Sequence, residues 1–422
     1  MARAIRAWLA SIFCVATTLT LLSGCALYAG GEGGGGEGGG GAITFLHWRG
    51  EDQQVFGELA EGFEEETGIR VEQSVLPSDA YTAQSQQTIL SGRGADVFAT
   101  QPGSQFRQLT DAGVYADLTD AEFTGRFDEQ FIEAGRTEGG EQLTLPYQLV
   151  FNIPVYNVRL LEEAGFDEPP QDWEGFLSLC DALKEQGAAP IAFAGNTSAS
   201  QFINPMLMNN QPSDDIWQRV EAGEARVTED WYVETLSQIA ELRDRGCFQD
   251  DPLGSTQEGI SALFAQEEAG MMALGSYQMA TVAEQNPDIE QDLLAPITVP
   301  AEEARYDGIY TSTFMLGVNA KGENQEAARQ WVEYLTRPEN AATYANDTGQ
   351  LLTLSEVDYT SEILRTQQPW REKRLLFQPR FELTVEEIDQ GMRTSVEDIL
   401  SGSAPEEAAQ SFQSTIDRAI QE

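Results

Sequence analysis

The segment that follows residue 41 alternates short apolar runs with amphipathic helical patterns, and this alternation limits the available folds more than any other feature. Residues 42–46 predict a buried strand, and residues 69–75 and 95–99 predict two more. Between them lie two stretches with a helical period, the first of which ends at Thr67-Gly68. Strands that alternate with helices are typical of an α/β fold with a largely parallel sheet.

Polar and aromatic side chains follow the ends of two of these predicted strands. His47 and Trp48 come directly after the first strand, and Gln101 follows the third. Ligands of open α/β sheets bind beyond the carboxyl ends of the strands. We therefore expect these residues near a ligand, with Glu51 and Asp52 as acceptors for ligand hydroxyl groups.

The remainder of the chain continues the pattern and is too long for one compact core, which favours two domains. The apolar stretch 143–156 contains Pro146 and Pro154, so an uninterrupted central strand is not expected there, and a segment that crosses between domains suits it better. Helical periods predict further helices over 172–186, 229–245, 256–266, 276–285, 324–336, 384–400 and 405–420.

The N-terminal residues have the layout of an export signal. Arg3 and Arg6 precede an apolar run over 8–22, which is shorter than the ~20 residues of a membrane-spanning helix. The run ends in Leu-Ser-Gly-Cys, which resembles a bacterial lipobox with Cys25 as the lipid attachment site. A stretch of almost pure glycine then runs to residue 41 and is expected to act as a flexible tether.

Composition excludes several classes of function. The formal charge is −44, and it becomes −46 once the signal with its two arginines is removed, so nucleic acid is not an expected partner. The chain has a single histidine, His47, which excludes a multi-histidine metal site. No phosphate-binding glycine loop is present, because the glycine-rich stretch does not follow a strand. We expect no metal and no cofactor.

Two of the four cysteines belong to the N-terminal segment, which leaves Cys180 and Cys247 in the folded body. An exported protein matures in an oxidising environment, which favours a disulfide between them. Cys180 also lies on the apolar face of a predicted helix with Phe176 and Leu183, which is typical of a core residue. Both interpretations stay open.

The order of segments resembles the extracellular sugar-binding proteins of ABC importers, the family that includes the maltose-binding proteins. The resemblance covers about residues 43–420 and is carried by six motifs in order. They are ITFLHW, FEEETGIRVE, GADVFAT, LPYQLVFNIPVYNVRLLEEAGFDEPPQDWEGFLSLCDALKEQG, FAQEEAGMMALGSYQMA, and GIYTSTFMLGVNAKGENQEAARQWVEYLTRPENAATYANDTG. The stretch with the Tyr-Asn pair, the paired prolines and the tryptophan at a helix start is the most specific.

This resemblance implies an α/β, two-lobed periplasmic-binding-protein-like fold with a hinged cleft. Three crossings between the lobes are expected near 147–154, 293–300 and 346–352. The implied organisation is a signal peptide over 1–24, the lipidated cysteine and tether over 25–41, lobe I over 42–150 and 298–348, and lobe II over 151–297 and 349–422.

Sugars present apolar C–H faces and a rim of hydroxyl groups, so their sites combine aromatic rings with convergent polar side chains. The family places an aromatic residue after a Gly-Ser or Gly-Pro turn, which here is Tyr277; this sequence has tyrosine where tryptophan is common. Trp217 is equally typical of a core residue. The candidate ligand-binding residues are His47, Trp48, Glu51, Asp52, Gln101, Tyr147, Gln148, Asn196, Trp217, Ser276, Tyr277, Tyr310 and Ser312.

The resemblance implies a monomeric lipoprotein outside the cytoplasmic membrane that captures a mono- or oligosaccharide and delivers it to the transmembrane subunits of an ABC permease. Only the lipid anchor is expected to contact the membrane. A surface glycoside hydrolase is an alternative, because the many carboxylates could include a pair ~5–10 Å apart. A polyamine ligand, suited to an acidic cleft, and a lipoprotein that only docks other proteins are two more.

Overall fold

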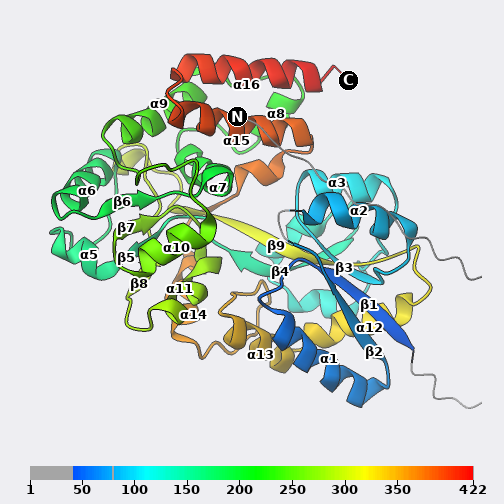
Figure 1. Cartoon of the computed structure of the whole chain (residues 1–422). Helices are drawn as coiled ribbons and strands as arrows, with labels where there is room; N and C mark the ends of the chain where they lie inside the picture. The colour runs from blue at the N-terminus through cyan, green and yellow to red at the C-terminus, as the bar shows by residue number, and fades with distance from the viewer. Residues whose placement is uncertain (1–40, 78–79, 422) are drawn as a thin grey trace, which may run out of the picture. The chain divides into compact units, whose positions relative to one another are not determined.

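The computed structural model describes residues 41–77 and 80–421, and Figure 1 gives their arrangement. A first sheet has the strand order β10-β9-β3-β1-β2, and β4 pairs with residues 311–317 of β9. Its strands are β1 (Ala42–His47), β2 (Arg70–Val75), β3 (Val97–Thr100), β4 (Thr144–Val150), β9 (Gly308–Val318) and β10 (Leu375–Phe377).

A second sheet has the order β6-β7-β5-β8. Its strands are β5 (Val155–Asn157), β6 (Ala189–Ala192), β7 (Ala269–Met272) and β8 (Gln291–Leu293). The chain passes from the first sheet to the second between Val150 and Val155 and returns between Leu293 and Gly308. The lobe boundaries expected from the sequence stay predictions; β10, which lies in the range expected for lobe II, pairs with β9 of the first sheet.

The α/β prediction is confirmed, but the expectation of a largely parallel sheet is wrong. β1 pairs with β2 and β3 in parallel, as the alternating strands and helices imply. The long strand β9, however, enters the first sheet from the second and runs antiparallel to both β3 and β4. A strand that returns without a preceding crossover helix on that sheet leaves no local signal for its direction.

Sixteen α-helices lie within the described residues. They are α1 (Gln53–Thr67), α2 (Tyr81–Ser91), α3 (Ser104–Asp111), α4 (Glu129–Ile132), α5 (Val158–Glu163), α6 (Trp173–Glu185), α7 (Gly195–Leu207), α8 (Ile216–Glu221), α9 (Asp230–Asp244), α10 (Gln257–Ala265), α11 (Met279–Gln285), α12 (Gln325–Leu335), α13 (Pro338–Thr348), α14 (Glu362–Gln367), α15 (Glu386–Leu400) and α16 (Pro405–Ala419). None of the described helices is long and apolar enough to cross a membrane.

Local chemistry explains where several helices begin and end. α1 buries Val55, Phe56, Leu59 and Phe63 and ends at Gly68, whose φ of 74° favours glycine. α6 begins after Asp172, whose carboxylate accepts a hydrogen bond from the Gly175 amide. The seven helices predicted beyond residue 170 are present within a few residues of their expected bounds, because each presents one apolar stripe to a core.

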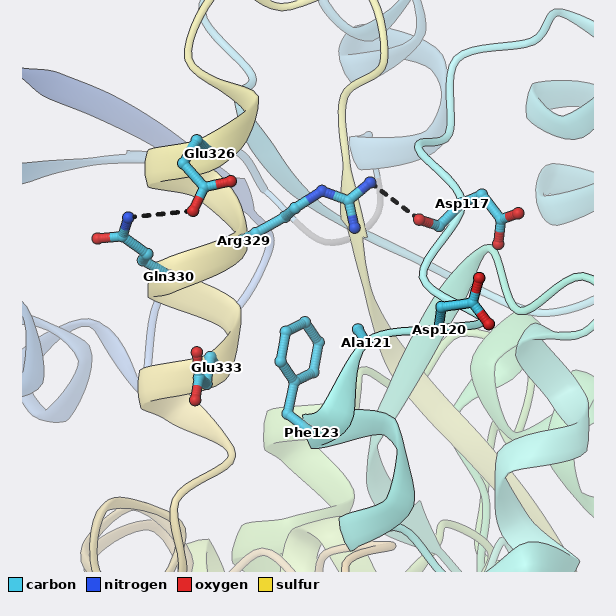
Figure 2. A pocket seen from close by; sticks show the side chains of 8 residues that line it. All are labelled: Asp117, Asp120, Ala121, Phe123, Glu326, Arg329, Gln330 and Glu333. Atoms are coloured by element: carbon cyan, nitrogen blue, oxygen red, sulfur yellow. Dashed lines mark hydrogen bonds between the residues drawn. The ribbon is translucent and has the colours of Figure 1, made fainter.

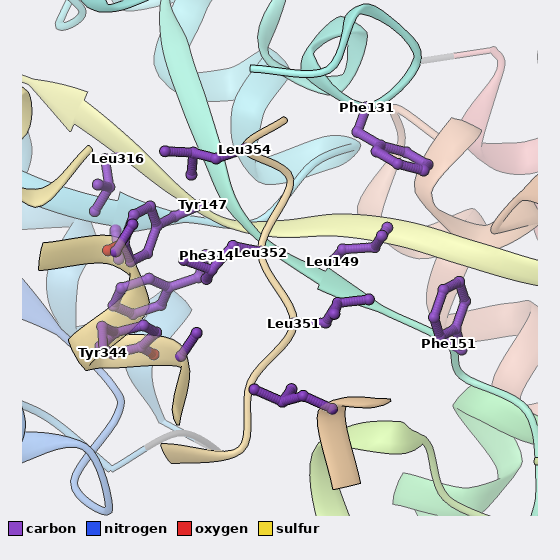
Figure 3. Close-up of a cluster of buried hydrophobic side chains, with 14 of the residues drawn as sticks. Phe131, Tyr147, Leu149, Phe151, Phe314, Leu316, Tyr344, Leu351, Leu352 and Leu354 are labelled. Carbon is purple, nitrogen blue, oxygen red and sulfur yellow. The ribbon is translucent and has the colours of Figure 1, made fainter. Parts of the chain in front are cut away.

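The stretch 143–156 is not one uninterrupted strand, as expected, because β4 ends at Val150 and β5 of the second sheet begins at Val155; the interruption, however, does not fall at Pro146. β4 runs from Thr144 to Val150 without a break at Pro146. Its second edge faces residues 351–353 rather than another strand of the sheet; Leu149 donates to the Leu351 carbonyl, and Gln148 forms an isolated bridge with Leu352. Proline is tolerated at such an edge because it lacks only a donor. Figure 3 shows Leu351, Leu352 and Leu354 lying along β4.

The helices cover the two sheets separately. α1, α12 and α13 contact one another, and α12 packs on β9. Around the second sheet, α6 packs on β6, and the C-terminal helices α15 and α16, red in Figure 1, both lie beside α9. The predicted signal peptide, lipobox and glycine tether lie outside the described residues.

Candidate functional site

The loop after β1 places one aromatic side chain at the surface of the core and buries the histidine. Trp48 is partly buried, with ring centroids 4.9 Å from Tyr81 and 5.0 Å from Phe314. His47 is fully buried, its Nε2 lies 3.1 Å from Gln73 Oε1, and its Nδ1 accepts a hydrogen bond from the Arg49 amide. Burial lowers the pKa of His47 to about 4, so the ring is neutral and already partnered.

Arg49 connects this loop to the crossing segments. Its guanidinium donates to Glu51 at 2.8 Å and to the side-chain oxygens of Gln148 and Gln350. Asp52 Oδ2 lies 3.6 Å from Arg49 Nε and accepts a hydrogen bond from the Tyr344 hydroxyl. Arg49 and Asp52 are both buried, while the Glu51 side chain is 59% exposed. The loop therefore offers one charged network with Glu51 at its open end.

The pKa values of Arg49 and Asp52 depend on the burial of this ion pair. Burial by itself lowers the pKa of Arg49, but the nearby Asp52 carboxylate and Tyr344 outweigh that effect and raise it. Burial raises the pKa of Asp52, although Arg49 and the hydrogen bond from Tyr344 act in the opposite direction. The carboxylate thus depends on the guanidinium beside it to remain ionised.

A tight turn after β7 presents Tyr277. The Ser276 amide donates to the Phe151 carbonyl at 2.9 Å, and the Phe151 amide donates to the Ser276 hydroxyl at 3.1 Å. A Cβ on Gly275 would collide with Asn152 Oδ1, so the turn can approach this closely only with glycine. Tyr277 is partly buried, and its hydroxyl contacts Gln201 at 3.0 Å and Gln257 at 3.4 Å. Burial raises the pKa of Tyr277 to about 12, so the hydroxyl stays protonated.

Several polar atoms near this turn lack a partner among the described residues. Asn152 Oδ1 lies beside Gly275, and Gln201 Oε1 belongs to the amide that contacts Tyr277. Gln378 Nε2 belongs to the side chain that accepts from Asn152 at 2.7 Å. Ser312 Oγ on β9 is also unpartnered. Buried polar groups are nearly always hydrogen-bonded, so such a group of orphan atoms indicates a place where a polar ligand or water binds.

Other candidates from the sequence lie elsewhere. Trp217 is fully buried in an aromatic cluster, 5.4 Å from Trp231, and Tyr147 is buried with its hydroxyl bonded to the Leu335 carbonyl. Asn196 is directed to α15, where its amide donates to Glu397 at 3.1 Å. We leave these three residues and His47 out of the proposed site, because core packing or another helix already occupies their side chains.

Gln101 and Tyr310 remain partly accessible. The backbone amide of Gln101 donates to the Gln105 side chain at 2.9 Å. Tyr310 packs on Phe131 at 5.2 Å and on Phe377 at 5.5 Å. Both stay candidates, but no contact links either of them directly to Tyr277.

The cavity in Figure 2 lies between α12 and the loop around residue 120 of the first-sheet body. It has a volume of about 360 Å³, and Arg329 donates across it to the Asp117 carbonyl at 2.9 Å. Its lining residues are Asp117, Asp120, Ala121, Phe123, Glu326, Arg329, Gln330 and Glu333. None of these was a sequence candidate. Among residues 41–77 and 80–421, no cluster of three or more potential metal ligands is present.

Comparison with known proteins identifies the family. Residues 49–342, more than half of the chain, match the model of the family described as bacterial extracellular solute-binding protein. The chain belongs to this family. It is 21% identical over 322 residues to the multiple sugar-binding protein of Streptococcus mutans, covering 70% of each chain.

Solved structures share the fold of this solute-binding protein. The solute-binding protein RafE in complex with raffinose has a TM-score of 0.77 at 17% identity, covering 90% of this chain and 99% of that one. A sugar transporter of Bacillus licheniformis in complex with stachyose has a TM-score of 0.74 at 19% identity, again covering 90% and 99%. The two-lobed solute-binding fold predicted from the sequence is therefore confirmed.

In this solute-binding protein, five residues of the candidate site were not predicted from the sequence. They are Arg49, Asn152, Gln201, Gln350 and Gln378. Arg49 lies next to the predicted Trp48, and a basic residue in an acidic chain is a signal that could have been used. The four amides carry no comparable signal, since amide side chains occur throughout the sequence.

Cys180 and Cys247, the two cysteines within the described residues of the solute-binding protein, are free and buried. A hydrogen bond to Cys247 raises the pKa of the Cys180 thiol, so the two side chains are neighbours. The structure thus contains two core thiols, and a disulfide formed in an oxidising environment stays a proposal.

Replacing Glu382 with glutamine is expected to flatten the pH dependence of stability. Burial, with Asp214 and Asp215 nearby, raises the pKa of Glu382 to about 8. The folded state therefore holds a proton that the unfolded chain releases above its ordinary pKa of about 4.3. The stabilisation is complete below about pH 4 and is lost as pH rises towards 8, by on the order of a few kcal/mol.

Melting temperatures of the wild type and E382Q at pH 5 and pH 8.5 measure this effect. The wild type is expected to lose more stability than the variant between the two pH values. The same substitution at Glu386, whose side chain is 60% exposed, serves as the control. Equal losses in the wild type and E382Q would contradict the prediction.

Proposed function

We propose that this chain captures a carbohydrate between Trp48 and Tyr277 and delivers it to an ABC importer. The observation that carries the proposal is the group of unpartnered polar atoms on Asn152, Gln201 and Gln378 beside the Tyr277 turn. Hydroxyl groups of a sugar could satisfy these atoms while a sugar face packs on the tyrosine ring.

Three further points support the proposal. The multiple sugar-binding protein of Streptococcus mutans is one relative, and two proteins of the same fold bind raffinose and stachyose. Glu51, with its exposed carboxylate, lies at the end of the Arg49 network and could accept hydroxyl groups. The partners proposed are the transmembrane subunits of an ABC permease, and the protein acts as a monomer that binds its ligand without transforming it.

A thermal-shift screen of residues 42–422 tests the proposal. The panel contains monosaccharides, raffinose, stachyose, chitin oligosaccharides, polyamines and amino acids. A ligand at 100 times its Kd stabilises the folded state by about 2.7 kcal/mol, so one sugar class should raise the melting temperature clearly. Recovery of that sugar intact after incubation separates binding from hydrolysis. A shift with a polyamine alone, or with no compound, would refute the carbohydrate proposal.

We also propose that the mature chain is held outside the cytoplasmic membrane by a lipid on Cys25. The sequence of residues 22–25 and the glycine-rich stretch that follows support this proposal. Replacing Cys25 with serine is expected to move the protein from the membrane fraction to the soluble fraction. Cys14→Ser, a change of the other N-terminal cysteine, should leave the distribution unaltered. A C25S protein that stays in the membrane fraction would contradict the lipid anchor.

A further inference from the structure

Gln350 lies where the chain leaves α13 and approaches the second sheet. Gly349 ends α13 with a φ of 66°, and a Cβ there would lie 2.7 Å from the Ala280 Cβ of α11. The following residues, 351–353, run along β4 of the first sheet. Gln350 is 5% exposed. Its side chain therefore lies in a buried position where elements of both sheets meet.

The oxygen and the nitrogen of the Gln350 amide form hydrogen bonds with different parts of the chain. Oε1 accepts a hydrogen bond from Arg49 at 3.1 Å, and Nε2 donates to the Tyr277 carbonyl at 3.4 Å. Arg49 also donates a hydrogen bond to the side-chain oxygen of Gln148 on β4. A continuous chain of polar contacts thus runs from the loop after β1 of the first sheet to the turn after β7 of the second.

We propose that Gln350 is a positioning residue that couples the two sides of the sugar site, by holding the Tyr277 turn in register with the Arg49 loop. This inference rests on the proposed function. Trp48 is next to Arg49 in the chain, and the position of the Tyr277 ring depends on the position of the Tyr277 backbone. One amide thus joins the Arg49 side chain to the Tyr277 backbone, and this link restrains the spacing between the two aromatic groups that face the sugar.

The chemistry of an amide suits this role. Only a side chain that both accepts and donates can bond a guanidinium and a backbone carbonyl at once. The bond to Arg49 is buried and the bond to the Tyr277 carbonyl is partly buried, so breaking either leaves a polar atom that water reaches poorly. A relative movement of the two lobes would stretch the longer bond to Tyr277 first, so Gln350 favours the arrangement with the two aromatic groups in register.

Three variants test the coupling. Gln350→Met keeps the length of the side chain and removes both bonds. Gln350→Glu keeps an acceptor for Arg49 but cannot donate to the Tyr277 carbonyl. Gln291→Met is the matched control, because Gln291 is also a buried amide that donates to a backbone carbonyl, that of Met279 at 2.7 Å.

The first readout needs no sugar. Hydrogen exchange is measured on peptides that cover residues 48–52 and 275–279 in the ligand-free protein. Gln350→Met is expected to accelerate exchange in both peptides, and Gln350→Glu mainly in the second. Gln291→Met should leave exchange of residues 48–52 unchanged, because the only monitored residue that Gln291 bonds is Met279. Unchanged exchange of residues 275–279 in both Gln350 variants would overturn the inference, whatever the ligand of the protein is.

The second readout is the Kd for the panel sugar that stabilises the wild type most. Loss of one hydrogen bond corresponds to about a fivefold weaker Kd, so Gln350→Met is expected to weaken binding by at least that factor, with a melting temperature no lower than that of Gln291→Met. Equal affinities of Gln350→Met and the wild type would overturn the positioning role. Failure of every sugar to bind the wild type would refute the proposed function, while the exchange measurement still tests the coupling.

Discussion

Replacing Tyr277 with alanine is expected to weaken sugar binding by about 30-fold or more, while the protein stays folded. A central aromatic residue of a binding site typically contributes about 2 kcal/mol, which corresponds to that factor. Tyr277 is only partly buried, so its ring supports the core less than a fully enclosed side chain does. The turn before it is held by bonds of the Ser276 amide and hydroxyl to the Phe151 backbone, which the substitution leaves in place.

Isothermal titration with the sugar found in the screen measures the effect, and the melting temperature checks the fold. Tyr277→Phe is the matched control, since it keeps the ring and removes only the hydroxyl that contacts Gln201 and Gln257. If the ring is the platform, the phenylalanine variant should lose much less affinity than the alanine variant. A folded Y277A protein with unchanged affinity would remove Tyr277 from the site.

Replacing Arg49 with methionine is expected to destabilise the protein by about 3–5 kcal/mol. Removing one partner of a buried ion pair leaves the other charge uncompensated. Here the remaining group is Asp52, whose side chain is 3% exposed and whose pKa burial already raises. Gln148 and Gln350 would also lose the donor that their side-chain oxygens accept from.

Chemical denaturation of the wild type and R49M at pH 7 gives the difference in the free energy of unfolding. Adding Asp52→Asn to R49M should recover part of the loss, because it removes the stranded carboxylate. Arg337→Met is the control: this arginine pairs with Glu66 at 2.7 Å, but the two side chains are 31% and 49% exposed, so about 1 kcal/mol or less is expected. A loss for R49M no larger than that for R337M would contradict the buried-pair interpretation.

Local patterns in the sequence predicted most of the elements but not their pairing. The apolar period of residues 53–67 or 405–419 is set by the core face of a single helix, so the pattern is present whatever the helix packs against. The direction of β9 depends on where the chain returns from the second sheet. The residues of β9 themselves do not indicate that path. Pro146 lies within β4 for a similar reason, because tolerance of a proline depends on which partner each edge of the strand has.

The residues of the candidate site also differ in whether local sequence patterns predict them. Tyr277 and Trp48 could be named from the sequence because each follows a strand or turn with a recognisable pattern. Trp217 has the same residue type as Trp48, yet it packs against Trp231 in a core. Burial of a given aromatic residue is decided by its neighbours in space, and composition alone does not separate the two cases.

Local periods and short motifs were enough to predict the α/β class, the positions of most helices, the family and the aromatic residue after the Gly-Ser turn. Which polar side chains meet depends instead on how distant parts of the chain pack together. Arg49 and Gln350 are separated by 301 positions in the chain, yet they share a hydrogen bond of 3.1 Å. Such a contact arises from the packing of elements that are far apart in the chain. Neither local segment therefore predicts it.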